Sequence, residues 1–147
     1  MPSNQCLLKS ISGGVLAPPR KLRMKQMREE ELQHKLLMDL SDLNLPTDEV
    51  SIEIRPYSKS YFGRYIIKEK RILIYPYASK NGQLYSYNNI LCTAIHEMVH
   101  HIQHQDPNFK RKKGVMHDTQ FWRLYNHFLD RVTAMGILSE SEVRRKK

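Results

Sequence analysis

The chain is poor in cysteine and has no long apolar run. Cys6 and Cys92 lie far apart, and Cys92 falls inside an apolar helical pattern, which excludes a disulfide framework and a four-cysteine zinc module. No segment approaches the roughly 20 apolar residues that a membrane-spanning helix requires. Lys9 and the Gly13-Gly14 pair interrupt the weakly apolar opening, which argues against a secretory signal. We therefore expect an intracellular, cytoplasmic protein without a membrane span.

Acidic residues are scarce relative to basic ones. The sequence has 24 lysines and arginines but 15 aspartates and glutamates, which gives a formal net charge of +9. This excess favours polyanionic partners, with nucleic acid ahead of an anionic membrane surface. The charged fraction of 27% and the apolar fraction of 40% are ordinary for a folded protein, so the composition argues against global disorder.

The length of 147 residues fits one compact domain with loosely held ends. Residues 1–19 are rich in serine, glycine and proline, which predicts a flexible lead. We assign residues 20–138 to a single domain and residues 139–147 to a basic C-terminal tail. No internal repeat interrupts this arrangement.

The first element is predicted to be a long amphipathic helix. Within residues 20–45, Leu32, Leu36 and Leu40 recur at helical spacing. Pro46 then stops the pattern, because proline cannot continue a helix. Basic residues at its start and acidic residues in its middle indicate a solvated outer face.

A small sheet is predicted to follow. Residues 50–57 alternate apolar and charged side chains, which is the period of a half-buried strand. Residues 65–67 and 72–75 are apolar and flank a charged turn, which predicts a hairpin. We expect these strands to form an antiparallel sheet.

Two helices complete the expected fold. Asn88 or Asn89 is a candidate cap for a helix that continues through residues 90–105. Asp118 is the expected cap of the last helix and Gly136 its expected stop. The predicted class is α+β, with a small antiparallel sheet packed against a central helix and with N-terminal and C-terminal helices.

The segment CTAIHEMVHH carries the pattern that points to chemistry. His96 and His100 lie four residues apart, so on a helix both imidazoles point to one side and can reach one metal ion. Glu97 projects beside them, where a carboxylate can hold and deprotonate a metal-bound water. The apolar residues of the helix form a separate stripe, made of Leu91, Ile95, Met98 and Ile102. A surface pair of histidines on an amphipathic helix is the simpler alternative.

A catalytic zinc site needs a third protein ligand and an open position. His101 lies about 100° around the helix from His100 and cannot converge on the same ion. His104 continues the spacing but sits two turns from the first histidine, and Asp106 would require a glycine where Gln103 stands. His117, on a loop directly before the cap of the last helix, is our choice, with His104 and Asp106 left as alternatives.

The segments TAIHEMVHHIQ and KKGVMHDTQFW together resemble the SprT-like metalloprotease family, which includes the eukaryotic Spartan proteases. Carried over position by position, the resemblance implies zinc ligands at His96, His100 and His117, a catalytic glutamate at Glu97 and an aromatic residue at Phe121. It implies one catalytic Zn²⁺ ion and hydrolysis of peptide bonds in protein substrates by a water that the glutamate activates.

The similarity covers roughly residues 50–128 and implies a zincin-like domain whose sheet can receive a substrate strand. Met116 and Asp118 stand where the family commonly has glycines around its third histidine. The chain also lacks the four-cysteine zinc ribbon of many members, so the DNA binding of that ribbon is not transferred. A donor for the oxyanion would come from Tyr61, Tyr65, Tyr75, Tyr85, Tyr87 or Arg123, among which the sequence does not choose.

A second family, small metal-dependent hydrolases related to bacterial YgjP, also combines this helix motif with a later histidine and a Phe-Trp pair like Phe121-Trp122. Its third histidine usually follows more closely than His117 does here. That reading implies a small-molecule substrate. It remains an alternative to the protease.

A basic run lies on the loop that would deliver His117. Its members are Lys110, Arg111, Lys112 and Lys113, and a further basic run ends the chain at residues 144–147. DNA bound to these residues would lie near the metal, which favours DNA-associated proteolysis and a nucleoid or DNA-associated location. A solvated loop is the alternative reading of the run, and a non-catalytic nucleic-acid-binding protein is the third functional class.

Overall fold

The computed structural model describes residues 20–143, apart from the side chains of residues 21–23 and 27. The chain divides into two compact units, Met1–Glu31 and Leu32–Lys147. In the first unit, the described residues form the N-terminal half of the first helix. The second unit contains the rest of that helix, the sheet and the two later helices.

The predicted ends of the chain are described only in part. The flexible lead at residues 1–19 and the basic residues 144–147 lie outside the described residues. Residues 139–143 are described, and the Asn88 side chain donates a hydrogen bond to the Glu142 carbonyl at 3.0 Å. The assignment of residues 20–138 to a single domain stays a prediction.

Helix α1 (Arg20–Asp42) forms where the leucine spacing predicts it. Leu36 and Leu40 are fully buried, which places this face of the helix in the hydrophobic core. The helix ends a few residues earlier than expected, because Asn44 adopts the left-handed conformation (φ 62°) before Pro46 is reached. Asparagine tolerates this backbone better than most residues, so it turns the chain here.

Three short strands form the sheet: β1 (Ser51–Ile54), β2 (Gly63–Ile66) and β3 (Arg71–Ile74). β2 and β3 make the predicted hairpin, and Lys70 has a positive φ of 51° in its turn. Ile72 on β3 faces both neighbours, opposite Ile52 on one side and a residue of β2 on the other.

The expectation of an antiparallel sheet is wrong for one of its two pairings. The strand order is β1-β3-β2, and β1 pairs with β3 in parallel. The chain reverses direction twice between these strands, so they point the same way once β3 occupies the centre. β3 is also the most apolar strand, with Ile72, Leu73 and Ile74 all buried. Alternation within a strand carries no information about strand order, so the sequence could not distinguish a mixed sheet from an antiparallel one.

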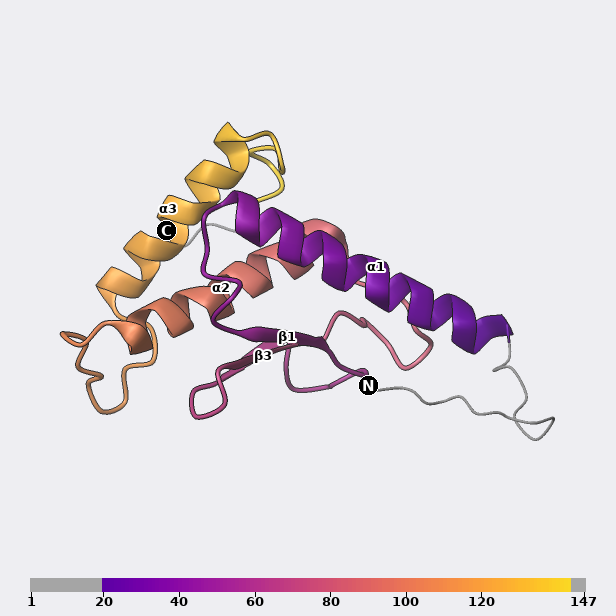
Figure 1. Ribbon diagram of the computed structural model, residues 1–147, viewed down its shortest axis with the longest axis horizontal. Helices are drawn as coiled ribbons and strands as arrows, with labels where there is room; N and C mark the ends of the chain where they lie inside the picture. Colours follow the sequence, from indigo (N-terminus) through magenta and orange to yellow (C-terminus); the bar gives the residue numbers. More distant parts are fainter. Residues whose placement is uncertain (1–19, 144–147) are drawn as a thin grey trace. The chain divides into compact units, whose positions relative to one another are not determined.

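Helix α2 (Tyr87–Gln105) lies between the sheet and the last helix, and it contacts β2 and β3 (Figure 1). Its N-cap is Ser86 rather than Asn88 or Asn89, because the helix begins at Tyr87, before either asparagine. Leu91, Ile95 and Met98 are fully buried, which confirms the predicted apolar stripe. The opposite face of α2 carries the histidines.

Helix α3 (Thr119–Ala134) packs against α2. Asp118 caps it by accepting a hydrogen bond from the Phe121 backbone amide at 2.7 Å, and Gly136 follows its end with a φ of 74°, both as predicted. The fold is therefore of the expected α+β class. None of the helices in the described part of the chain combines the length and apolarity needed to cross a membrane.

Candidate metal site and its surroundings

Helix α2 brings the two motif histidines to one side. The rings of His96 and His100 lie one turn apart, with their centroids separated by 5.1 Å. Both side chains are half-buried, since they face away from the apolar stripe and toward the start of α3. The spacing of four residues therefore places both imidazoles on one side of the helix, as the sequence predicted.

His117 completes a cluster of three imidazoles. Its Nε2 atom lies 3.0 Å from Nε2 of His96 and 3.2 Å from Nε2 of His100. One ring nitrogen carries either one hydrogen or one lone pair, so it cannot form good hydrogen bonds with both neighbours at once. The ligand atoms of the three residues all lie within 4.8 Å of one another, which is close enough to bind one metal ion.

The position of His117 is fixed by the residue that follows it. Asp118 caps α3 and also accepts a hydrogen bond from the Gln103 side chain at 3.1 Å. Gln103 lies on α2, one turn beyond His100, and is almost completely buried. This bond ties the loop to the helix that carries the other two histidines. Sequence reasoning used Gln103 only to exclude another ligand, and no local signal marked its partner.

The alternative third ligands lie elsewhere. Among the described residues, the only cluster of potential metal ligands contains the three histidines named above. His104 stacks on Tyr65, with ring centroids 6.2 Å apart, and contacts Phe109 edge to face at 5.2 Å. Asp106 is exposed and caps the C-terminal end of α2. Neither residue joins the cluster.

His101 has a different role from its neighbour in the sequence. It is fully buried, and its Nδ1 and Nε2 atoms lie 2.7 Å from the Tyr65 hydroxyl and 2.8 Å from a Glu49 carboxylate oxygen. Because the carboxylate can only accept, Nε2 donates to it, and in a neutral imidazole Nδ1 then accepts from the hydroxyl. His101 thus links α2 to β2 and to the segment before β1, which the sequence did not reveal.

An aromatic floor from α3 lies under the three histidines. The fully buried Phe121 ring has its centroid 4.8 Å, 4.6 Å and 4.7 Å from those of His96, His100 and His117. Trp122 packs against the last of these at 5.3 Å. Such a floor excludes water from one side of the cluster and strengthens electrostatic interactions within it.

Burial keeps the imidazoles of His96 and His100 uncharged at neutral pH. Burial, reinforced by the nearby His117, lowers the pKa of His96 to about 4. For His100, burial and then the neighbouring His96 and His117, with smaller effects from His104 and Arg111, lower the pKa to about 3. A neutral imidazole presents a free lone pair, so neither side chain needs to lose a proton before binding a metal.

Glu97 is buried between α2 and the sheet. Only 7% of the residue is exposed, and this burial raises the pKa of its carboxyl to about 7. β2 approaches closely at this point: a Cβ atom on Gly63 would lie 3.2 Å from Cγ of Glu97 and 2.7 Å from Cγ2 of Thr93. The glycine therefore allows the strand to approach the carboxylate, a requirement that sequence reasoning missed.

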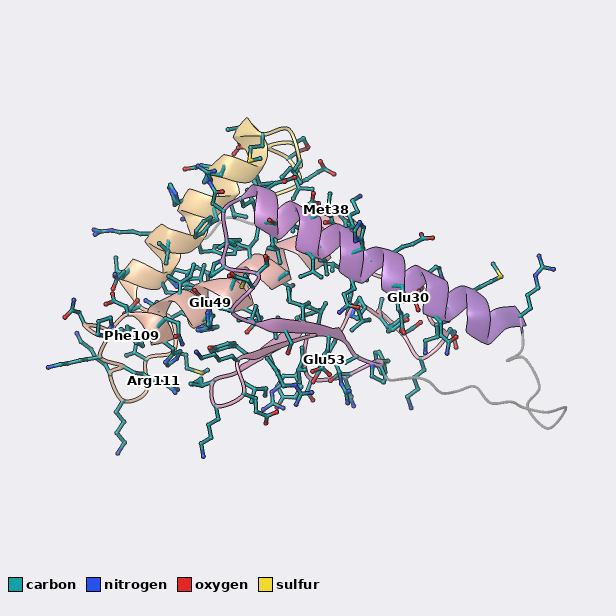
Figure 2. The ribbon with its side chains drawn as sticks, in the orientation of Figure 1. Glu30, Met38, Glu49, Glu53, Phe109 and Arg111 are labelled. Carbon is teal, nitrogen blue, oxygen red and sulfur yellow. The ribbon has the colours of Figure 1, made fainter. Side chains whose placement is uncertain are left out.

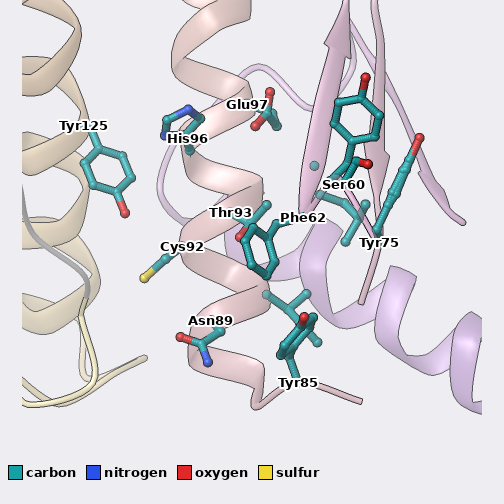
Figure 3. A pocket seen from close by; sticks show the side chains of 14 residues that line it. Ser60, Phe62, Tyr75, Tyr85, Asn89, Cys92, Thr93, His96, Glu97 and Tyr125 are labelled. Carbon is teal, nitrogen blue, oxygen red and sulfur yellow. The ribbon is translucent and has the colours of Figure 1, made fainter. Parts of the chain in front are cut away.

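A hollow of about 580 Å³ opens on one side of His96 and Glu97. We call it the aromatic pocket, because its wall includes Tyr61, Phe62, Tyr75, Tyr85 and Tyr125. Figure 3 shows the pocket along the N-terminal half of α2, with Tyr125 contributed by α3 and Tyr75 by the segment directly after β3.

A second hollow, of about 470 Å³, is lined by the same two residues. We call it the basic hollow, because Arg64, His104 and Arg111 line it together with all three clustered histidines. Glu97 and Gly63 line both hollows, so the carboxylate stands where the two meet.

The predicted basic run is placed beside this second hollow. Lys110, Arg111, Lys112 and Lys113 are all exposed on the loop between α2 and α3, and Figure 2 shows Phe109 and Arg111 on that loop. Arg111 lines the basic hollow, while Lys112 is close enough to help lower the pKa of Asp118, after the larger effect of the backbone hydrogen bond from Phe121.

The structure divides the candidates for the oxyanion donor into those that line the aromatic pocket and those that do not. Tyr65 is hydrogen-bonded to His101, and Tyr87 donates to Asp39 at 2.5 Å. Arg123 is exposed on α3 and lines neither hollow. The remaining candidates, Tyr61, Tyr75 and Tyr85, all line the aromatic pocket.

The cluster of three histidines and the buried carboxylate share one region of the fold, where α2, β2 and the start of α3 meet. The chain matches no family model, no curated protein and no solved structure.

Proposed function

We propose that the chain is a zinc-dependent metallopeptidase of the SprT-like, zincin class, which hydrolyses peptide bonds with Glu97 as the general base. The support comes from three imidazoles that converge from two segments and from a buried carboxylate that shares their surroundings. The helix motif and the later histidine that carry the resemblance are the residues that meet in space.

The ligand set supports zinc in particular. Three imidazoles with an open fourth position suit a catalytic Zn²⁺ ion, whereas calcium and magnesium prefer oxygen ligands. Zn–N bonds of about 2.0 to 2.1 Å in tetrahedral geometry place the ligand nitrogens about 3.3 Å apart. The Nε2 separations of 3.0 Å and 3.2 Å are close to this value, and this is the single observation that carries the proposal.

Glu97 has the properties that a general base needs. A zinc ion held by His96, His100 and His117 would lower the pKa of a bound water toward about 7 and polarise a carbonyl group. The burial that raises the pKa of Glu97 to about 7 matches the carboxylate to this range, so it can take a proton from water and later return it to the leaving amine. The aromatic floor formed by Phe121 keeps bulk water from one side of the site.

The edge of the sheet supports a peptide as the substrate. β2 is an edge strand that begins at Gly63, which lines both hollows beside Glu97. An extended peptide can pair with such an edge through backbone hydrogen bonds. The bound peptide would then run from the aromatic pocket to the basic hollow, past the carboxylate of Glu97.

The basic run supports proteins at DNA as the natural substrates, as the SprT-like resemblance implies. Arg111 lies close enough to contribute to the lowered pKa of His100, after burial and the nearer histidines, so a phosphate bound there would be near the site. We propose that DNA binds the exposed side chains of this loop and brings proteins attached to it to the basic hollow. Such an enzyme would work in the cytoplasm, at DNA.

The deciding experiment measures bound zinc and hydrolysis of casein in the same samples. Glu97→Gln should keep zinc and lose about 10²- to 10⁴-fold in rate, because only the proton transfer is removed. His117→Ala should lose both. His104→Ala is the matched control for zinc, since it removes a histidine of α2 that lies outside the cluster. Full zinc content and full hydrolysis in His117→Ala would contradict the proposal.

DNA binding is tested separately, with a short duplex and fluorescence anisotropy. Wild-type affinity should fall with log salt at a slope of about 0.9 per phosphate contacted, and replacement of the four basic loop residues by glutamine should reduce that slope. A charge-matched control replaces four exposed basic residues outside the loop: Lys59, Lys68, Lys80 and Arg123. An equal loss in both variants would point to net charge alone and refute the loop as the DNA site.

A small-molecule hydrolase of the YgjP-like kind is the second candidate, because the Phe-Trp pair lies against the cluster and Trp122 packs on His96 at 5.7 Å and on His117 at 5.3 Å. Cleavage of nucleotides with casein and histones untouched would favour it. A protein whose every measurable activity survives Glu97→Gln would instead be a non-catalytic nucleic-acid-binding protein.

A further inference from the structure

The two hollows beside Glu97 differ in chemistry. Arg64 and Arg111 line the basic hollow, whereas no lysine, arginine or aspartate among the described residues lines the aromatic pocket. Apart from the catalytic pair of His96 and Glu97, the ionisable groups in that pocket are tyrosine hydroxyls and the thiol of Cys92. An anionic side chain entering it would lose its water without gaining a partner of opposite charge, and a cationic one would find only Glu97, the proposed general base.

The aromatic wall of the pocket is held in two pairs. Tyr61 and Tyr75 stack with their ring centroids 5.8 Å apart, and Phe62 meets Tyr85 edge to face at 5.4 Å. Phe62 is nevertheless 62% exposed and Tyr61 46% exposed, so large apolar faces remain open at the mouth. Aromatic surfaces exposed at a concave site commonly mark the binding of an apolar group.

The location of the pocket limits what can occupy it. It is lined by Thr93, one turn before Glu97 on α2 (Figure 3), and by Gly63, the first residue of the edge strand. A peptide paired with that edge and cleaved next to Glu97 would project the side chain adjacent to the cleaved bond into this space. The volume of about 580 Å³ accommodates the largest natural side chains.

We propose that the aromatic pocket selects an aromatic or large aliphatic side chain on one of the two residues that flank the cleaved bond. This inference rests on the proposed peptidase function and adds the substrate preference of the same site. Occupation of the pocket excludes water from the faces of Phe62 and Tyr61 and leaves no charged group unpaired. Such pockets discriminate a large from a small apolar side chain by about 10- to 200-fold.

The catalytic test uses two measurements. Cleavage sites in reduced, denatured casein, mapped by mass spectrometry, should be enriched in aromatic and large aliphatic residues on one side of the cut. Fluorogenic peptides that differ only at that position should show kcat/KM about 10-fold or more higher for phenylalanine than for alanine, with aspartate and lysine lowest. Equal rates for all four peptides would overturn the inference.

A pair of substitutions separates the pocket from a general apolar effect. Phe62→Ala removes a residue that is 62% exposed at the aromatic pocket, so the fold should tolerate the change. Met116→Ala removes an equally exposed residue at the basic hollow. The first should reduce the phenylalanine-to-alanine ratio of kcat/KM about fivefold or more, and the second should leave this ratio unchanged. The opposite pattern would overturn the inference.

Binding without catalysis distinguishes failure of this inference from failure of the peptidase proposal. Saturation-transfer NMR should detect N-acetylphenylalaninamide, but not N-acetylalaninamide, on the metal-free protein, and Phe62→Ala should abolish the signal. This result would support the pocket even for a protein that hydrolyses no peptide. Hydrolysis of casein without residue preference, combined with no signal from either amide, would overturn the pocket and leave the peptidase intact.

Discussion

Replacement of Gly63 by alanine tests whether β2 must approach α2 closely at the candidate site. Gly63 has no positive φ, so its backbone conformation is accessible to alanine. A strand glycine of this kind is ordinarily stabilised by alanine, by about 0.4 to 1 kcal/mol. Here the added Cβ would lie 2.7 Å from Cγ2 of Thr93, a separation that real Cβ atoms essentially never show. We therefore expect the opposite sign.

The magnitude follows from what must move. Thr93 Cγ2 sits on a branched side chain of a packed helix, and Cγ of Glu97, at 3.2 Å, blocks movement in another direction. An extra methyl group forced into a packed position costs about 1 to 3 kcal/mol. Thr93→Ser removes the Cγ2 atom, so the double variant should recover most of the loss, with a coupling energy of about 1 kcal/mol or more.

Equilibrium urea denaturation of the four metal-free proteins measures this cycle: wild type, Gly63→Ala, Thr93→Ser and the double variant. The same proteins should be assayed for hydrolysis, because a shifted strand would also displace Glu97. Stabilisation by Gly63→Ala would refute the reasoning. A coupling energy near zero would do so as well, since it would show that the strand simply moves away.

Three further perturbations test other parts of the site. Because the folded-state pKa of Glu97 is raised from 4.5 to about 7, its contribution to stability is fully present below the unfolded pKa and is lost as pH rises through 7. The free energy of unfolding of metal-free wild type, relative to Glu97→Gln, should therefore fall by about 1 kcal/mol between about pH 6 and about pH 8. Because both proteins contain the same histidines, the contribution of histidine titration is removed by this comparison. Gln103→Ala frees the loop that carries His117 and should weaken zinc binding about 10- to 100-fold in calorimetry, with unchanged affinity as the contrary result. Tyr65→Phe leaves buried Nδ1 of His101 without its donor and should cost about 1 to 3 kcal/mol in urea, whereas the stoichiometry of bound zinc should stay at one.

Local patterns in the sequence predicted the parts of the site that depend on one element. The spacing of four between His96 and His100 is a property of any helix, and Asp118 caps α3 through a bond to a residue three positions away. The hairpin of β2 and β3 likewise follows from apolar runs on either side of a charged turn. These features need no knowledge of the rest of the chain.

The parts that the sequence did not predict depend on how elements meet. The parallel pairing of β1 with β3 follows from strand order, which alternation does not encode. The Gln103 bond to the loop, the link between His101 and Tyr65, and the close approach at Gly63 all join residues from different segments. A single sequence carries no sign of such partners.

The edge of β2 that no described strand covers also has a consequence for the behaviour of the protein at high concentration. Unpaired backbone groups at a sheet edge will accept any extended chain, including the same strand of another copy. β2 is only four residues long, and Arg64 projects an exposed charge from it, so two copies would gain few hydrogen bonds and would bring like charges together. An edge of this kind can hold a flexible peptide briefly while discouraging assembly into oligomers or aggregates.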